Sequence, residues 1–194
     1  HRVNDFEDPF TIDSVAAKDF DAQMRYISKQ YHVLSMEDIY HTINQGGNLP
    51  PGCLAITFDD GYADNYTFAW PILKKYGLPA TIFLTAGCID TRIPLWFDQV
   101  LAGFKSSRKE RFCSPFTRVV SDIQAPSQRL RTAHAILEQL KKAGQDNRQK
   151  MIPVVLSELG IENSTLPDTR FDLLTWSQIR EMTRGNISFG SHTM

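Results

Sequence analysis

The sequence is poor in features that mark several large classes of protein. Its 194 residues include three cysteines, Cys53, Cys88 and Cys113, and no two of them form a CxxC pair. An odd and scattered set argues against a disulfide framework, and we interpret the three as buried, unreactive thiols. No apolar run approaches the roughly 20 residues that a membrane span requires.

The sequence also has no excess of positive or negative charge. Lysine and arginine total 21 against 22 for aspartate and glutamate, a formal net charge of −1. Such a chain produces no field that would hold a phosphate backbone, so we expect no nucleic-acid partner. No basic and apolar leader precedes the first segment, but the chain opens at His1 without a methionine, so the compartment stays open.

Hydrophobic residues are plentiful, and one apolar stretch organises the rest. With 42% hydrophobic residues the chain can bury a core, and its length predicts one domain. Residues 54–58 carry no charge and lead directly into Asp59, Asp60 and Gly61. This pattern is typical of a buried parallel strand that ends at the rim of a sheet, where side chains meet ligands. An acidic turn after a core strand is the plainer alternative.

The two adjacent aspartates raise a geometric question. Neighbouring side chains on a strand point to opposite faces, so Asp59 and Asp60 would serve different purposes unless the strand has begun to turn. Gly61 permits such a turn and lets another group approach closely.

Strand and helix patterns alternate along the first half of the chain. Apolar spacing predicts a helix over about 17–30, and Ser35 starts a second one whose inner face we assign to Ile39 and Ile43. A third helix is predicted over about 64–76, in which Pro71 causes a kink or a late start. Strands are predicted at 33–34, 54–58 and 80–84. Two core strands joined by one helix form a βαβ unit, and therefore a parallel sheet.

The pattern becomes helical from residue 98 onwards, and we interpret residues 98–170 as a helical insertion. One helix is expected from about Ser127 to Gly144, and its apolar stripe consists of Leu130, Ala133, Leu137 and Leu140. A second helix follows and is interrupted at Pro153. After the insertion, a capping box begins a further helix at Thr175, and residues 187–192 predict a last strand.

Polar groups with useful chemistry therefore follow two strands, Asp59 and Asp60 after one and His192 at the end of the other. Ligands gather at the carboxyl ends of parallel strands, so these side chains can converge. A carboxylate with an imidazole suits a hydrolytic metal site for Zn, Fe or Co. A second carboxylate beside it would take a proton from a metal-bound water. A lone histidine at a rim is more often a polar cap, and this alternative stays open.

These motifs resemble those of the polysaccharide deacetylases, the NodB-homology family or carbohydrate esterase family 4. Thr57-Phe58-Asp59-Asp60-Gly61 resembles the first motif, and Ser191-His192-Thr193 the opening of the second, His-Ser/Thr-x-x-His. The flanking residues 62–65 and 77–83 also resemble those of the family. His1-Arg2-Val3 is similar to a Tyr-His-Arg-Val stretch in one branch, whose sequence order is permuted. The resemblance covers most of 5–76 and 172–194, and the family's later arginine-, aspartate- and tryptophan-bearing motifs have no match.

The resemblance implies a role for each matched residue. Asp59 corresponds to the general base, Asp60 to a metal ligand, His192 to the first metal histidine and His1 to a general acid. The second metal histidine would follow four residues after His192, beyond Met194. We also assign Gly61, Tyr62 and Trp96 to substrate binding, although the aromatic cluster around Trp96 suits a core lid equally well.

The resemblance also implies the fold and the reaction. The fold would be α/β, part of a distorted (β/α) barrel of seven strands. Residues 1–194 would form one domain, incomplete at both ends and lacking the last strands, and we expect this chain by itself to bind metal weakly and to be inactive. The activity would be metal-dependent removal of N-acetyl groups from a polysaccharide or oligosaccharide of N-acetylated amino sugars. The metal would be divalent, most suitably Zn, with Co, Ni or Fe as substitutes, and the family leans towards the cell envelope.

Two other functions compete with this interpretation. A non-catalytic carbohydrate-binding relative is favoured by the missing second histidine. A magnesium phosphatase would also place paired aspartates at a strand end, but in the haloacid-dehalogenase type they are spaced Asp-x-Asp, whereas these are adjacent. The polymer, the metal and the oligomeric state are not specified by the sequence.

Overall fold

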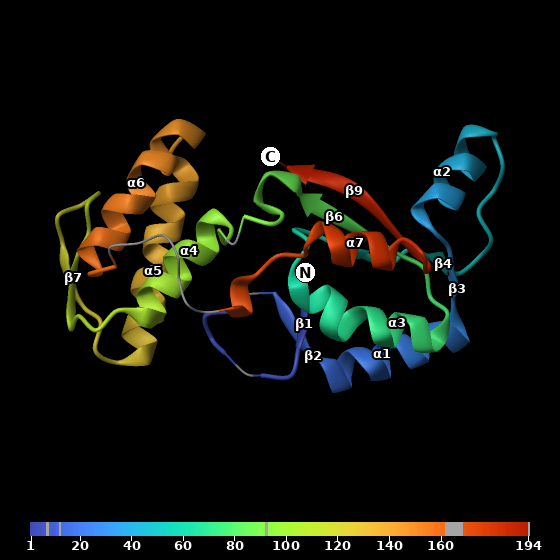
Figure 1. Cartoon of the computed structure of the whole chain (residues 1–194), viewed down its shortest axis with the longest axis horizontal. Helices are drawn as coiled ribbons and strands as arrows, with labels where there is room; N and C mark the ends of the chain where they lie inside the picture. The colour runs from blue at the N-terminus through green and yellow to red at the C-terminus, as the bar shows by residue number, and fades with distance from the viewer. Residues whose placement is uncertain (7, 12, 92, 162–168, 194) are drawn as a thin grey trace. The chain divides into compact units, whose positions relative to one another are not determined.

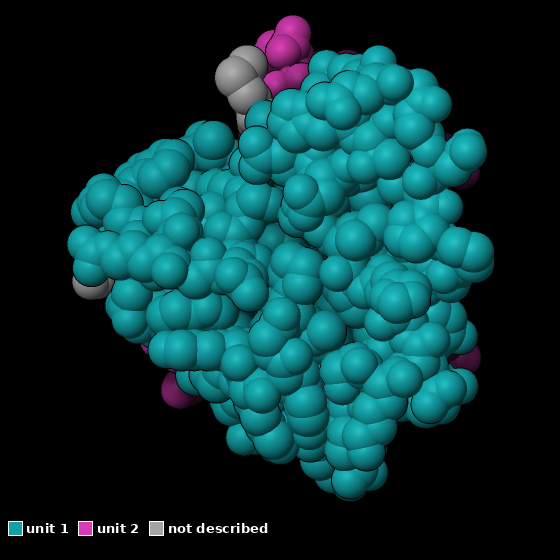
Figure 2. All heavy atoms as spheres, turned by 90° about the vertical axis from the view of Figure 1, so that its right-hand side faces the viewer, with its two compact units in different colours: residues 1–7, 13–92, 172–194 teal, residues 8–12, 93–171 magenta. Residues whose placement is uncertain are grey.

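The computed structural model describes residues 1–194 except 7, 12, 92, 162–168 and 194. Its residues group into two compact units, coloured separately in Figure 2. Unit 1 comprises His1–Glu7, Asp13–Arg92 and Asp172–Met194, and unit 2 comprises Asp8–Ile12 and Ile93–Phe171.

A three-stranded parallel sheet lies at the centre of unit 1 (Figure 1). Its strand order is β5 (Thr57–Phe58), β6 (Ala80–Thr85) and β9 (Ile187–Thr193). Between β5 and β6 the chain forms a five-residue π-helix, η1 (Asn65–Ala69), and then α3 (Trp70–Tyr76), with Pro71 in the first turn of α3. This confirms the βαβ unit and the parallel sheet. Helical conformation begins at residue 63, near the predicted start, and changes from a π-helix to α3 one residue before Pro71.

The strand predicted at 54–58 is divided between two sheets. β4 (Cys53–Leu54) pairs in parallel with β3 (His32–Val33), whereas β5 pairs with β6. The backbone changes partner between them, because the Leu54 carbonyl accepts from Leu34 and the Ile56 carbonyl accepts from Thr81. A further parallel pair joins β1 (Arg2–Asn4) to β2 (Ser14–Ala16). The strands of the described residues thus form four small sheets and no closed barrel.

Three helices bury apolar side chains in the core of unit 1. α1 (Ala17–Gln30) contributes Phe20 and Met24 and lies beside α3, which contributes Leu73. α7 (Trp176–Met182) starts at the predicted capping box, where the Thr175 side chain accepts from the Gln178 backbone N–H. The bounds of α1 and the cap of α7 are as expected, because both rest on local signals of spacing and capping.

α2 (Met36–Asn44) corrects one expectation. Ser35 caps it as predicted by accepting from the Asp38 N–H, but none of its residues is buried. Ile43, assigned to an inner face, is 58% exposed. The helix only connects β3 to β4, and a two-stranded sheet is too small to cover a helix face.

Unit 2 packs α4 (Trp96–Ser106), α5 (Pro126–Lys142) and α6 (Gln145–Glu158) around a core of its own. α5 agrees with the helix expected near 127–144, whereas α6 continues through Pro153. The sequence pattern did not predict the antiparallel hairpin of β7 (Arg111–Cys113) and β8 (Val120–Asp122). Two short 3₁₀ turns, η2 (Ala86–Cys88) and η3 (Thr169–Phe171), lie in units 1 and 2 respectively. The insertion boundaries at 98–170 stay a prediction.

The three cysteines are free and half-buried rather than fully buried. Burial raises the pKa of the Cys88 thiol, which lowers the fraction of reactive thiolate. In the described part of the chain, no helix combines the length and the hydropathy that crossing a bilayer demands.

The core of unit 1 should be sensitive to truncation at Leu73, which is 1% exposed. Leu73→Ala is expected to lower the free energy of unfolding by about 2–5 kcal/mol, because the lost apolar contacts leave a cavity. Urea unfolding of the variant measures this loss. Lys74→Ala, at an exposed position of the same helix, should change it by less than about 0.5 kcal/mol. Similar losses in both variants would contradict the packing described here.

Candidate active site

The acidic pair lies in a tight turn immediately after β5. The Gly61 N–H donates to the Asp59 carbonyl at 2.8 Å, and Asp60 between them has φ 71°. A hydrogen bond across three residues with positive φ at the centre defines a γ-turn of the rare, strained kind. Backbone strain of this sort persists only where the surroundings enforce it. Because the strand has already turned, Asp59 and Asp60 need not point to opposite faces.

The end of β6 fixes this turn from one side. The Thr85 N–H donates to the Asp60 carbonyl at 3.3 Å, and the Leu174 N–H donates to the Gly61 carbonyl at 2.8 Å. Gly61 has φ 82°, and a Cβ atom there would lie 2.6 Å from Cδ2 of Leu84. Residue 61 is therefore glycine for two reasons, its backbone conformation and the closeness of the Leu84 side chain on β6.

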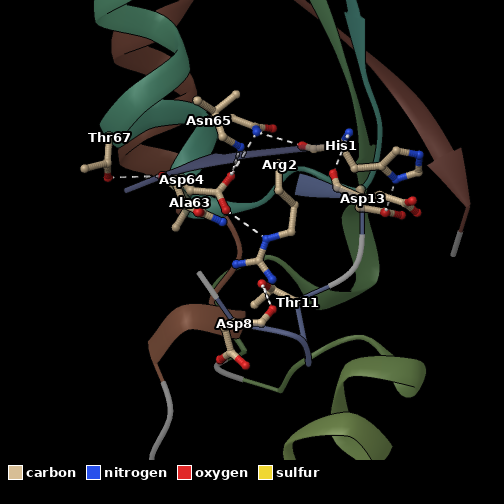
Figure 3. A network of polar contacts seen from close by, with 12 residues as sticks. His1, Arg2, Asp8, Thr11, Asp13, Ala63, Asp64, Asn65 and Thr67 are labelled. Carbon is tan, nitrogen blue, oxygen red and sulfur yellow. Dashed lines mark hydrogen bonds and ion pairs between the residues drawn. The ribbon is translucent and has the colours of Figure 1, made fainter. Parts of the chain in front are cut away.

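His1 contacts both aspartates. Its Nδ1 lies 2.9 Å from Oδ2 of Asp60, and its Nε2 lies 3.5 Å from Oδ2 of Asp59. The side chains of His1 and Asp59 are 40% and 35% exposed, whereas that of Asp60 is 9% exposed. One buried carboxylate therefore lies beneath a histidine and a second carboxylate that solvent can reach. Figure 3 shows the side chain of His1 and the hydrogen bonds that hold His1 and Arg2.

The environment of His1 raises the pKa of its imidazole. Partial burial lowers the pKa, but the hydrogen bond to Asp60 and the charges of Asp60, Asp59 and Asp13 outweigh it. The aspartates stabilise the protonated ring, since opposite charges nearby favour the charged form. A cation bound at Asp60 would act in the opposite direction.

His192 reaches the same carboxylate from β9. Its Nε2 lies 3.7 Å from Oδ1 of Asp60, on the oxygen that His1 does not contact. The pairing of β6 with β9 shifts here, because Leu84 is opposite Ser191 and Thr85 is opposite Thr193. His192 is the extra residue of this bulge. Bulges commonly redirect a side chain next to an active site.

The Asp60–His192 pair is compatible with a divalent metal. A tetrahedral zinc ion with ligand bonds of about 2.1 Å separates its donor atoms by roughly 3.4 Å. The 3.7 Å between the two side chains is close to that value, and carboxylate and imidazole are both zinc ligands. Among the residues described, no group of three or more histidine, cysteine or acidic side chains is arranged to hold a metal. Asp60 and His192 therefore lie at a distance that two ligands of one metal ion would have, and their role as metal ligands stays a prediction.

The residues expected to bind substrate have other surroundings. Tyr62 is 2% exposed and packs under the Arg2 guanidinium, whose central carbon lies 4.3 Å from the ring centroid. Trp96 belongs to unit 2, where it is half-buried and contacts Phe97 and the Arg148 guanidinium. A role for Gly61, Tyr62 or Trp96 in substrate binding stays a prediction.

A buried polar cluster lies next to His1 in the chain and was not predicted from the sequence. Arg2 Nε donates to Oδ2 of Asp64 at 2.8 Å, and both side chains are almost fully buried. Burial raises the pKa of the Asp64 carboxyl, against the opposing effect of the Arg2 charge. In the sequence, residues 62–65 were assigned no role beyond flanking the first motif. The local pattern gave no signal for this pair, because Arg2 and Asp64 both stand among polar residues in the sequence, where charged side chains are usually exposed.

The need for glycine at position 61 is testable. Gly61→Ala is expected to lower the free energy of unfolding by about 2–3 kcal/mol, since it adds a clash with Leu84 to the cost of a left-handed backbone. Gly52→Ala is the matched control, because Gly52 has φ 69° with no atom within 4 Å of the added Cβ. It should lose only about 1 kcal/mol. Equal losses in urea unfolding would show that the approach of β6 does not constrain residue 61.

Comparisons with known proteins bear on this site. Residues 46–194 match the sequence model of the polysaccharide deacetylases. YxkH of Bacillus subtilis, whose name assigns it provisionally to the polysaccharide deacetylases, is 38% identical over 87 residues, which make up 44% of this chain and 31% of that protein.

Two solved structures resemble the chain as a whole. The Streptococcus pyogenes deacetylase PplD, solved in complex with acetate, matches with a TM-score of 0.51 and 19% identity over 100% of this chain and 54% of its own. A de-N-acetylase from Aggregatibacter actinomycetemcomitans matches with a TM-score of 0.51 and 18% identity over 99% of this chain and 52% of its own.

At these identities the two structures show the fold alone. The chain spans about a third of the curated relative and about half of the two solved chains. The sequence model, in contrast, covers well over half of this chain and includes the acidic turn and His192. The chain belongs to the polysaccharide deacetylase family.

Proposed function

We propose that this chain carries the acidic and histidine residues of a metal-dependent hydrolase that removes N-acetyl groups from a polysaccharide or oligosaccharide of N-acetylated amino sugars. The observation that carries the proposal is the convergence of Asp59, Asp60, His1 and His192 in a member of this family. Four polar groups from three separate segments meet at the carboxyl end of a parallel sheet, where α/β enzymes build their sites.

Asp60 and His192 would hold a divalent metal, most suitably Zn. Catalytic zinc sites use three protein ligands and keep one position open. By the family resemblance, a third ligand would lie four residues after His192. When bound, such a metal lowers the pKa of a water molecule and stabilises negative charge that develops on the acetyl oxygen.

Asp59 and His1 would move the protons. Asp59 is more exposed than Asp60 and would accept a proton from the attacking water as the bond from its oxygen to the acetyl carbon forms. His1, 3.5 Å from Asp59, would donate a proton to the amine nitrogen as the carbon–nitrogen bond breaks. The products are acetate and a free amino sugar.

The proposal extends to the fold and the compartment. We infer that the sheet β5–β6–β9 is part of a distorted (β/α) barrel of seven strands, into which residues 98–170 are inserted. The parallel strands and the fold shared with two deacetylases that are about twice as long support this inference. A place in the cell envelope is proposed from the family alone.

A non-catalytic carbohydrate-binding relative is the second candidate. Both candidates share the two donors that the described residues bring together, and they differ in whether the whole protein supplies a third. Such a protein would bind N-acetylated oligosaccharide without releasing acetate.

The two aspartates should be separable by metal content. In the whole protein that carries this chain, Asp59→Asn is expected to keep its zinc and lose about 10²–10⁴-fold in turnover, because it removes the proton acceptor. Asp60→Ala should lose the metal itself, because it removes a ligand. Elemental analysis of the purified variants and acetate release from oligomers of N-acetylglucosamine measure the two effects.

Asp19→Asn is the matched control, since Asp19 is an exposed aspartate on α1. It should keep both metal and activity. Equal metal content in the Asp59 and Asp60 variants would contradict the assigned roles. Oligosaccharide binding without acetate release by the zinc-loaded protein would favour the non-catalytic relative.

A further inference from the structure

The main chain of His1 is held by a side chain from far along the sequence. Asn65 Nδ2 donates to the His1 carbonyl at 3.0 Å and to Oδ1 of Asp64 at 3.1 Å (Figure 3). Both partners are acceptors, so the amide nitrogen must face them. Asn65 is 0% exposed and begins η1, four residues after Gly61. The segment that leaves the acidic turn therefore folds back onto the strand that follows His1.

Asp64 holds the next two residues of that strand. Its Oδ2 accepts from Arg2 Nε at 2.8 Å, and its Oδ1 accepts from the Val3 N–H at 3.5 Å. Two consecutive side chains thus contact three consecutive residues, His1, Arg2 and Val3. A slip of β1 by one residue would break all of these contacts at once, so together they fix its position along the strand direction.

Stability alone does not explain this choice of residues. Oδ1 of Asn65 is buried and has no hydrogen-bond partner among the residues that the structure describes. A buried polar atom left unpaired costs folding free energy. A buried ion pair such as Arg2–Asp64 is also a weak source of stability, because apolar side chains of similar volume often serve as well. The polar residues instead provide a defined position for β1.

The position of β1 matters because it places the imidazole of His1. The His1 side chain is 40% exposed, so its surroundings do not confine it on every side. Where the ring lies relative to Asp59 and Asp60 therefore depends on where the backbone of residue 1 is anchored.

We infer that Asp64 and Asn65 are positioning residues for His1, which act through β1 and hold the imidazole between Asp59 and Asp60. The side chains of Asp64 and Asn65 are buried, so these residues would act without touching substrate. The inference deepens the proposed function and rests on it for the kinetic half of its test.

The kinetic test is a double-mutant cycle in the whole zinc-loaded protein, with oligomers of N-acetylglucosamine as substrate. Asn65→Ala is expected to lower kcat about 10–100-fold with little change in KM, because a misplaced catalytic group costs turnover more than binding. In a His1→Ala background the same substitution should cost less than about twofold, since effects that pass through one residue are not additive. An equal further loss in both backgrounds would overturn the inference.

A second readout does not depend on activity. The imidazole ¹H–¹⁵N signals of His1, assigned by comparison with His1→Ala, should shift or broaden in Asn65→Ala, while those of His134 in unit 2 stay unchanged. Asn65→Leu keeps a similar side-chain volume and removes the unpaired oxygen, so it should retain the fold and show the same displacement of His1. Unchanged His1 signals in either folded variant would overturn the inference, even if the wild-type protein releases no acetate and the proposed function fails.

Thr67→Ala is the matched control. Thr67 also lies in η1, and its hydroxyl donates to the Ala63 carbonyl at 3.2 Å. The Thr67→Ala substitution removes one side-chain hydrogen bond of the same helix and leaves every bond to His1 and β1 in place. Both kcat and the His1 signals should stay as in the wild type, and a loss equal to that of Asn65→Ala would indicate a general effect on η1 instead.

Discussion

The hydrogen bond from the Gly61 N–H to the Asp59 carbonyl closes a turn that β5 alone would not form, since it forces Asp60 into a left-handed conformation. An aspartate adopts such a conformation more readily than most residues but still at a cost. The structure holds the turn with hydrogen bonds from Thr85 and Leu174 and with the side chain of Leu84 against Gly61. A free strand end would relax, so the geometry of both carboxylates depends on the packing of β6.

The same end of β6 also determines where His192 lies. Up to Leu84 and Ser191 the parallel pairing of β6 with β9 is regular, and then His192 is left out of the register. A regular strand would pair His192 with Thr85 and direct its side chain according to the strict alternation of the sheet. The bulge removes that restriction and brings Nε2 to 3.7 Å from Asp60. One strand end thus supports both donors of the proposed metal site.

Local signals in the sequence were sufficient for much of the fold. The apolar spacing of α1, the caps at Ser35 and Thr175 and the βαβ unit each depend on residues close together in sequence, and the structure contains all of them. The motif also identified Asp59, Asp60 and His192, which the structure brings together. Their proximity follows from a general rule of parallel sheets, so it did not require knowledge of the packing.

The features that were missed depend on partners far away in sequence. The division of 54–58 into β4 and β5 is decided by which neighbour donates each hydrogen bond to its carbonyl groups. The exposure of Ile43 follows from the small size of the two-stranded sheet that α2 connects. The local sequence pattern predicts neither the division of this strand nor the exposure of Ile43. The contact between Asp64 and Arg2 likewise joins positions 62 residues apart. Both charged residues stand among polar residues in the sequence, so nothing in the local pattern indicates that they are buried or that they pair with each other.

The buried cluster and the turn together explain why the site can be assembled from three segments. Each segment is held through its backbone: β1 by Asp64 and Asn65, the turn by Thr85 and Leu174, and β9 by its pairing with β6. Backbone anchors leave the side chains of His1, Asp59 and His192 partly exposed at the sheet edge, where they can meet a ligand. Side chains that were themselves the anchors would have their donors and acceptors occupied. The division between buried polar residues that hold the backbone and exposed polar residues that do chemistry is therefore a physical requirement of a site built from separate segments.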